Sequence, residues 1–214
     1  MIIYPLTIII HIIKPSDDTF LLCDALFNDR DELVNIISSD NNDGIVLEIG
    51  TGSGCVLTFM AMMMKDANVN NVKCIGIDIN NKAVDMAMKT AASNCVNVEV
   101  TCNDFADDYM NRYNGLIDIL IFNPPYVPTD DDELGSEGIE AAWAGGTDGR
   151  VVIDRFMPLV ARLLSPRGRF YLVVVEENKP KQIIKDISIQ GLKGEIVLKR
   201  QAINEGLQII KFTR

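Results

Sequence analysis

Basic residues, histidine and tryptophan are scarce in this chain of 214 residues. It has 20 lysines and arginines against 30 aspartates and glutamates, and its formal net charge is −10 at pH 7. Nucleic-acid phosphates are bound by clustered Lys and Arg side chains, so this balance argues against direct binding to nucleic acid. The single histidine, His11, lies in an apolar run, and we expect it to pack rather than to act as a general base.

Long hydrophobic runs and paired cysteines are also missing. The longest apolar stretch, residues 1–13, is shorter than the roughly 20 residues that cross a bilayer, and it lacks the flanks of a signal peptide. We therefore expect no membrane segment and no leader. The five cysteines contain no C-x-x-C pair, which argues against a disulfide framework and a metal site. Free thiols persist in reducing compartments, so we predict that the protein lies in the cytoplasm, or in both the cytoplasm and the nucleus.

What the chain does contain is an alternation of short β-branched runs with helical stretches, typical of an α/β fold. The expected helices run from residue 16 or 17 towards 37 and over 55–65, 82–94, 151–164 and 183–189. A turn at 165–168 ends the fourth of these helices. The expected strands cover 45–49, 72–77, 96–101, 117–122, 170–175, 194–199 and 207–212. Continuously apolar strands predict a mostly parallel sheet covered by helices on both faces.

The last two strands are joined by a connection of residues 200–206. That is too short for a parallel crossover, so we expect them to pair antiparallel. Ligands of such sheets bind outside the carboxyl ends of the parallel strands. Gly50, Asp78, Asp104 and Asn123 each follow a different strand, and we expect them to meet in one crevice.

A glycine-rich turn, Glu48-Ile-Gly-Thr-Gly-Ser-Gly54, joins the first strand to the next helix. Its glycines permit positive φ and close approach of a ligand, and the helix amides that follow can hold an anion. The spacing is G-x-G-x-G, which differs from the G-x-G-x-x-G of dinucleotide sites. The alternative is an ordinary tight turn, although such a turn has little use for the carboxylate of Glu48.

Two acidic residues follow the next two strands. Asp78 can accept hydrogen bonds from both hydroxyls of a ribose, and Asp104 can accept one from an adenine amino group, with Phe105 lining the ring. Either aspartate could instead cap the helix that follows it.

The sharpest motif is Asn123-Pro124-Pro125-Tyr126, after the fourth strand. Two prolines hold the backbone rigid, so that the Asn123 carboxamide oxygen and a proline carbonyl can accept both hydrogens of a planar NH₂ group. Tyr126 can stack on that plane. Such a clamp aligns a weakly nucleophilic amine by positioning and electrostatics. The alternative is a rigid turn without chemistry.

Together these motifs resemble class I S-adenosylmethionine-dependent methyltransferases that methylate planar amines. The stretch from Gly135 to Gly146, then Gly149-Arg150, Asp154-Arg-Phe156 and Leu164-Ser-Pro-Arg-Gly168, resembles the eukaryotic and archaeal branch of the HemK-type glutamine methyltransferases. The resemblance covers about residues 14–214. It implies a Rossmann-like, mostly parallel seven-stranded sheet with an antiparallel C-terminal strand, in a single domain of residues 1–214. Residues 1–40 would form an N-terminal segment and helix that cover the cofactor site.

The resemblance also implies an activity and its partners. The substrate would be the glutamine of the Gly-Gly-Gln motif in the class-1 translation termination factor, and a small zinc-binding activator protein would complete a heterodimer. It assigns S-adenosylmethionine to Thr19, Glu48, Gly50, Asp78, Asp104, Phe105 and Asn123. It assigns catalysis to Asn123, Pro124 and Tyr126, which bind the substrate amide together with Pro125. The family commonly has Tyr-Glu-Pro where this chain has Ile13-Lys-Pro15, which affects the segment over the cofactor.

Two other activities fit the same clamp. One is an adenine-amine methyltransferase that acts on DNA or RNA, which the acidic charge disfavours. The other is a non-catalytic subunit that binds the cofactor, which an intact clamp disfavours.

The third strand, expected over Val96–Thr101, would lie at an edge of the sheet in such a fold. It carries one charge and no proline, so it lacks the usual protection of an exposed edge. We expect a partner to add a strand there, unless residues 8–13 of the same chain cover it.

Overall fold

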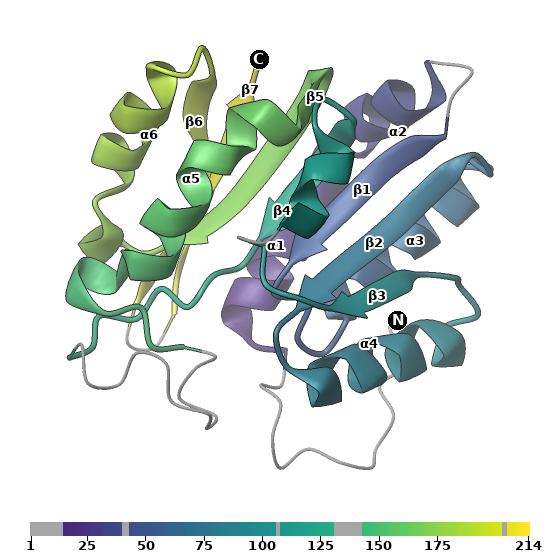
Figure 1. The fold of residues 1–214 in the computed structure, drawn as a ribbon, viewed down its shortest axis with the longest axis horizontal. Coiled ribbons are helices and arrows are strands. Elements are labelled where there is room, and N and C mark those ends of the chain that lie inside the picture. The colour runs from purple at the N-terminus through teal and green to yellow at the C-terminus, as the bar shows by residue number, and fades with distance from the viewer. Residues whose placement is uncertain (1–14, 40–42, 106–107, 131–142, 203–204) are drawn as a thin grey trace.

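The protein is built on one seven-stranded sheet with helices on both faces (Figure 1). The computed structural model describes residues 15–39, 43–105, 108–130, 143–202 and 205–214. Its strands are β1 (Gly44–Ile49), β2 (Val72–Asp78), β3 (Glu99–Cys102), β4 (Ile117–Phe122), β5 (Leu164–Val174), β6 (Lys193–Gln201) and β7 (Gly206–Thr213). Its α-helices are α1 (Asp17–Asn28), α2 (Arg30–Ser38), α3 (Cys55–Asp66), α4 (Asn81–Ser93), α5 (Val151–Leu163) and α6 (Pro180–Ser188). Short 3₁₀ turns are η1 (Asp108–Tyr113), η4 (Thr147–Gly149) and η5 (Glu176–Asn178).

The strand order is β3-β2-β1-β4-β5-β7-β6. The first five strands in this order are parallel, and β7 runs antiparallel to both β5 and β6. The predicted mostly parallel sheet, its antiparallel C-terminal pair and the edge position of the third strand are confirmed. The parallel order brings the carboxyl ends of β1, β2, β3 and β4 to one side of the sheet, where the predicted site lies. None of the described helices is long and apolar enough to cross a membrane.

The first predicted helix is interrupted at Asp29, so the expectation of one continuous helix towards residue 37 is wrong. Asp29 ends α1 and precedes α2, with ψ of 9°. Its carboxylate accepts a hydrogen bond from the Tyr171 hydroxyl at 2.6 Å and lies 2.8 Å from the ammonium of Lys211. Both partners belong to the sheet, and they draw the chain inward at the break. Sequence alone could not reveal this, because the partners lie far along the chain.

Two strands begin three or more residues away from the expected position, whereas the other strand ends shift by at most two residues. Hydrogen bonding of β3 begins at Glu99, so Val96 and Val98 precede the strand, although both are partly buried. In contrast, β5 begins at Leu164, where a turn was expected. Gly168 permits this because a Cβ there would lie 2.7 Å from the carbonyl oxygen of Ile117 on β4.

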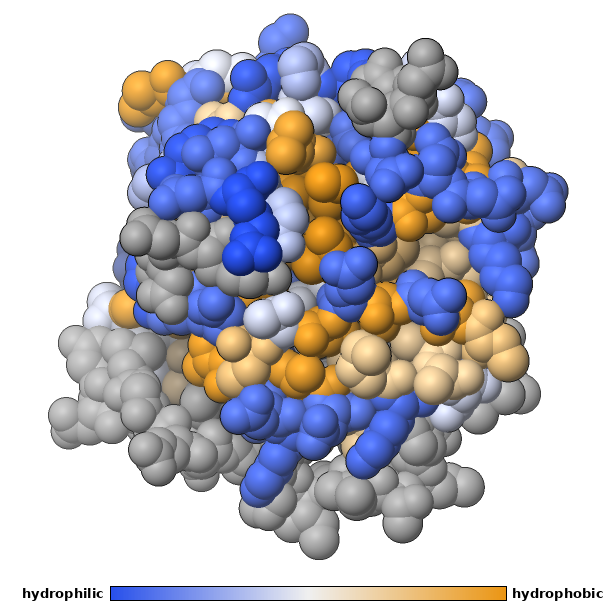
Figure 2. Space-filling model, turned by 45° about the vertical axis from the view of Figure 1, so that its right-hand side comes forward, coloured by the Kyte–Doolittle hydropathy of each residue, from blue (hydrophilic) through white to orange (hydrophobic). Residues whose placement is uncertain are grey.

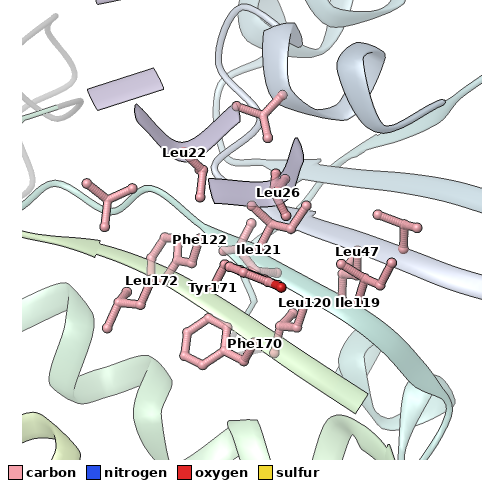
Figure 3. Packing of buried hydrophobic residues seen from close by; sticks show 14 of the residues in the cluster. Leu22, Leu26, Leu47, Ile119, Leu120, Ile121, Phe122, Phe170, Tyr171 and Leu172 are labelled. Carbon is pink, nitrogen blue, oxygen red and sulfur yellow. The ribbon is translucent and has the colours of Figure 1, made fainter. Parts of the chain in front are cut away.

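The core is continuous across both faces of the sheet. Figure 3 shows Leu22 and Leu26 of α1 over Ile121 and Tyr171, with Phe170 pointing to the opposite face. On that opposite face a row of edge-to-face and stacked rings runs from the site towards the C-terminal strands: Phe105, Phe122, Phe156, Phe170 and Phe212. Each fully buried ring of this row stabilises the fold by about 1.5–3 kcal/mol. Because Phe105 and Phe122 also line the site, the packing of the core extends to the wall of the cavity.

Helices α3 and α4 touch at one very close contact. Gly54 precedes α3, and a Cβ there would lie 2.4 Å from the Cα of Ala87 in α4. Its φ of 72° is also in the left-handed region that favours glycine. The absence of a side chain at Gly54 thus sets the distance between the two helices that follow β1 and β2.

Candidate functional site

A cavity of about 420 Å³ opens at the carboxyl ends of the parallel strands, in the size range of small-molecule sites. Every residue that the sequence analysis assigned to cofactor or substrate lines it: Thr19, Glu48, Gly50, Asp78, Asp104, Phe105, Asn123, Pro124, Pro125 and Tyr126. The individual roles of these residues remain predictions. The structure does bring all ten together from five separate segments of the chain.

The glycine-rich turn forms one wall of the cavity. Gly50, Gly52 and Gly54 all have positive φ, between 53° and 72°. The amide of Gly50 donates to the carbonyl of Ile77 on β2 at 2.8 Å, which holds the turn against the neighbouring strand. The turn therefore presents backbone, without side-chain bulk, to whatever the cavity binds.

Two carboxylates, one buried and one half-buried, flank this turn. Glu48 is 2% exposed, and its carboxylate accepts the Leu57 amide at 3.1 Å. Burial raises the pKa of Glu48 well above its usual value. Asp78 accepts the amides of Gly52 and Asn80, each at 2.9 Å. Burial raises the pKa of Asp78, although these two amides oppose the rise.

The helix-cap alternative for Asp78 is excluded by the geometry. Asn80 caps α4, because its side chain accepts the Lys82 amide at 3.0 Å. Asp78 instead links the glycine-rich turn to the start of the segment between β2 and α4, and it borders the cavity. A carboxylate in this position fits a ligand that carries hydroxyl donors.

Beside the predicted adenine-binding residues lies an arginine to which the sequence analysis assigned no role in the site. Arg155 of α5 forms an ion pair with Asp104, and its guanidinium lies over the Phe105 ring, 4.4 Å from the centroid. The predicted hydrogen bond from an adenine amino group to Asp104 therefore has to form beside this ion pair. Helical spacing gave no signal for Arg155, because it is an ordinary polar position of an amphipathic helix.

The Asn-Pro-Pro-Tyr clamp, Asn123–Tyr126, has a defined orientation. The Asn123 amide nitrogen donates to Asp18 of α1 at 2.9 Å. A carboxylate can only accept, so the opposite side of the carboxamide must be its oxygen. That oxygen is buried and has no hydrogen-bond partner among the residues that the structure describes. The clamp thus holds one carbonyl oxygen that is free to accept a hydrogen bond.

Tyr126 is held by the same carboxylate and by a second one. Its hydroxyl lies 3.2 Å from Asp18 and 3.3 Å from Glu205. Burial and these neighbouring acids raise the pKa of Tyr126, so the phenol keeps its proton at neutral pH. The sequence analysis missed both Asp18 and Glu205. The first lies 108 residues before Tyr126 and the second 79 residues after it.

These features fit S-adenosylmethionine. The cavity has room for a nucleoside, a glycine-rich turn that presents backbone, a half-buried carboxylate for hydroxyl groups and an aromatic ring beside a second carboxylate. Among the described residues, no group of three or more His, Cys, Asp or Glu side chains is placed to hold a metal ion.

Comparison with known proteins agrees with this geometry. The family model of the methyltransferase small domain matches residues 31–191. The chain is 45% identical over 201 residues to methyltransferase HEMK2 of Homo sapiens, covering 94% of this chain and 89% of the relative. It is 36% identical over 211 residues to the eRF1 methyltransferase catalytic subunit mtq2 of Schizosaccharomyces pombe, covering 94% and 88%.

A solved structure extends the likeness to three dimensions. The E. cuniculi Mtq2–Trm112 complex, described as responsible for methylation of the eRF1 translation termination factor, matches with a TM-score of 0.63 and 26% identity. The match covers 94% of this chain and 98% of that chain. The chain therefore belongs to the methyltransferase small domain family and, within it, to the eukaryotic and archaeal branch of the HemK-type glutamine methyltransferases.

Proposed function

We propose that the protein methylates the side-chain amide of the glutamine in the Gly-Gly-Gln motif of the class-1 translation termination factor, with S-adenosylmethionine as methyl donor. The observation that carries this proposal is the free, buried carboxamide oxygen of Asn123. It is a hydrogen-bond acceptor where an amide NH₂ group would enter. The names of the relatives, eRF1 methyltransferase among them, support the same substrate.

The chain's own residues supply alignment and electrostatic stabilisation. The cofactor, when bound, supplies an electrophilic methyl group. An amide nitrogen is a poor nucleophile and gains positive charge as the new bond forms. The Asn123 oxygen, and the Pro124 carbonyl as the second proposed acceptor, then bind the NH₂ hydrogens more strongly than in the ground state. Tyr126 covers the amide plane, and it stays neutral because its hydroxyl faces two carboxylates.

Asp18 determines how the clamp is presented. Its carboxylate accepts the Asn123 amide at 2.9 Å and also the Thr19 backbone amide at 2.6 Å. The start of α1 is thereby tied to the end of β4, and Ser16, Asp18 and Thr19 line the cavity. This supports the proposal that residues 1–40, in a single domain of residues 1–214, cover the cofactor site. Residues 1–14 lie outside the described part of the chain.

The test is methyl transfer from labelled cofactor to the termination factor, measured beside an adenine oligonucleotide. We expect labelling of the protein, with loss of the label when the Gly-Gly-Gln glutamine is replaced by alanine. Labelling of the oligonucleotide alone would favour the adenine-amine reaction instead. Binding of the cofactor without transfer to either acceptor would favour a non-catalytic subunit.

We also propose that the protein is the catalytic subunit of a heterodimer with a small zinc-binding activator. Support comes from the E. cuniculi complex and from the sheet edge at β3. Val96, Val98 and Val100 are partly buried and pack against the core, while Asn97 and Glu99 between them are exposed. Figure 2, in which the β3 side of the molecule comes forward, shows hydrophobic side chains gathered between polar ones.

A partner strand beside β3 would pair its open backbone groups. Hydrogen exchange of the Val96–Thr101 amides, with and without the partner, tests this. The amides that bond to β2 are protected in the lone chain, and we expect the amides that face away from β2 to become protected only in the complex. Complete protection in a fully active lone chain would contradict the proposal for this edge. We further propose a cytoplasmic, and additionally nuclear, location, supported by five free thiols.

A further inference from the structure

A fully buried carboxamide lies behind the clamp, outside the cavity lining. Asn178 ends η5 and has no exposed surface. Its oxygen accepts the Val175 amide at 2.8 Å. Its nitrogen donates to the carbonyl oxygens of Tyr126 at 2.8 Å, Asp148 at 2.9 Å and Gly149 at 3.3 Å. One side chain thus joins the segment after β4, the η4 turn and the segment after β5, using both its donor and its acceptor side.

The three segments meet without spare space. A Cβ at Gly149 would lie 1.9 Å from the Tyr126 carbonyl oxygen and 2.5 Å from the Asn178 amide nitrogen. A Cβ at Gly145 would lie 2.7 Å from the Cα of Gly149. The Tyr126 carbonyl therefore has its position set by contact as well as by hydrogen bonding.

Backbone strain is concentrated at the same place. Asp148 and Lys179 both have φ of 56°, in the left-handed region that non-glycine residues rarely adopt. Their side chains form an ion pair at 2.5 Å. Asn178 bonds the carbonyl of the first and precedes the second in sequence. Such strain persists only where the surrounding contacts demand it, and it gathers at functional sites.

These contacts of Asn178 lie next to the two segments that form the substrate side of the cavity. The chain leaves Tyr126 and pairs at Val127 with the returning segment: the Val127 amide donates to the Trp143 carbonyl at 3.1 Å, and the Gly145 amide donates to the Val127 carbonyl at 2.8 Å. Tyr126 and Trp143 both line the cavity. The cofactor-side carboxylates, in contrast, belong to β1 and β2.

We propose that Asn178 is a positioning residue for the substrate, holding Tyr126 and Trp143 in place through their backbones. The inference rests on the proposed amide methylation for its kinetic consequence. It predicts that Asn178 affects methyl transfer, with no effect on cofactor affinity. A residue that only stabilised the fold would change cofactor affinity together with methyl transfer.

The experiment compares Asn178→Asp in the complete heterodimer with wild type. Aspartate keeps the acceptor for Val175 and loses the donors to three carbonyls. If that variant does not fold, Asn178→Ser replaces it. The matched control is Ser165→Ala, which removes a half-buried hydrogen bond of 2.8 Å to Asp118 near the amino ends of β4 and β5, at the other edge of the sheet from the cavity. Readouts are kcat with both substrates saturating, cofactor Kd by calorimetry, and acrylamide quenching of Trp143, the single tryptophan.

We expect kcat to fall about 100-fold, as for a small misplacement of reacting groups, with the wild-type cofactor Kd and with stronger quenching of Trp143. The control should leave all three readouts unchanged. A folded variant with wild-type kcat and wild-type quenching would overturn the inference. An equal loss of cofactor affinity would do so too, because it would mean general loosening. If wild type itself does not methylate glutamine, the proposed function fails, and the Trp143 quenching still decides whether Asn178 holds this side of the cavity.

Discussion

Replacing Asn123 with alanine isolates the acceptor on which the proposed reaction depends. The carboxamide oxygen of Asn123 is buried and accepts no hydrogen bond from the described part of the chain, so the hydrogen bond lost is one made to substrate. By analogy with removal of an oxyanion-hole donor, the transition state should lose about 2.7–4 kcal/mol, or roughly 10²–10³-fold in kcat. The fold should tolerate the change, because Asp18 keeps the Tyr126 hydroxyl and the Thr19 amide as donors.

The assay is single-turnover transfer of labelled methyl with cofactor and termination factor both saturating. Asn103→Ala is the matched control, since Asn103 lines the same cavity from the end of β3. We expect cofactor affinity to stay near wild type in both variants and kcat to fall only in Asn123→Ala. A kcat for Asn123→Ala equal to that of the control would refute the assignment of Asn123 as the acceptor.

Three further substitutions test the remaining parts of the site. Asp18→Asn should lower kcat by about tenfold, because an amide can accept or donate and no longer fixes the orientation of Asn123; the loss corresponds to one hydrogen bond of about 1.4 kcal/mol, and unchanged turnover would contradict it. Asp78→Ala should raise the cofactor Kd with little change in saturated kcat, since a carboxylate that binds hydroxyls contributes uniform binding; calorimetry that finds wild-type affinity would remove Asp78 from the cofactor site. Glu48→Gln should stabilise the protein increasingly as pH rises. Burial raises the folded pKa of Glu48 above its usual value of 4.5. The protonated side chain therefore contributes its full stability below about pH 4.5, and this contribution is lost as pH rises through the folded pKa. Urea unfolding at acidic and neutral pH checks this, and a stability difference independent of pH would contradict it.

Sequence patterns predicted the sheet well because parallel strands buried on both faces are apolar throughout. The expected strand over residues 117–122 coincides with β4. The convergence of Gly50, Asp78, Asp104 and Asn123 followed from strand direction alone. Boundaries failed where tertiary contacts decide them, as at Asp29, where a tyrosine and a lysine of the sheet interrupt a helix that periodicity would continue.

The residues that orient the clamp were beyond the reach of such patterns. Asp18 lies in the first turn of a helix, and nothing local in the sequence connects it to Asn123, 105 residues later. Asn178 follows two glutamates in what reads as a polar turn. Its complete burial depends on three carbonyls from segments up to 52 residues away. No role in the site was predicted for Arg155 either, because its partner Asp104 lies in a distant segment of the chain.

The contact between Gly54 and Ala87 has a consequence for protein engineering. The cavity lies between the chain segments that lead into α3 and α4, and these helices are as close as an absent side chain permits. A methyl group at position 54 would force α4 outward and carry the Asp78–Asn80 connection with it. Libraries that seek acceptance of bulkier cofactor analogues should therefore sample the contact between Gly54 and Ala87 as well as the residues that face the ligand.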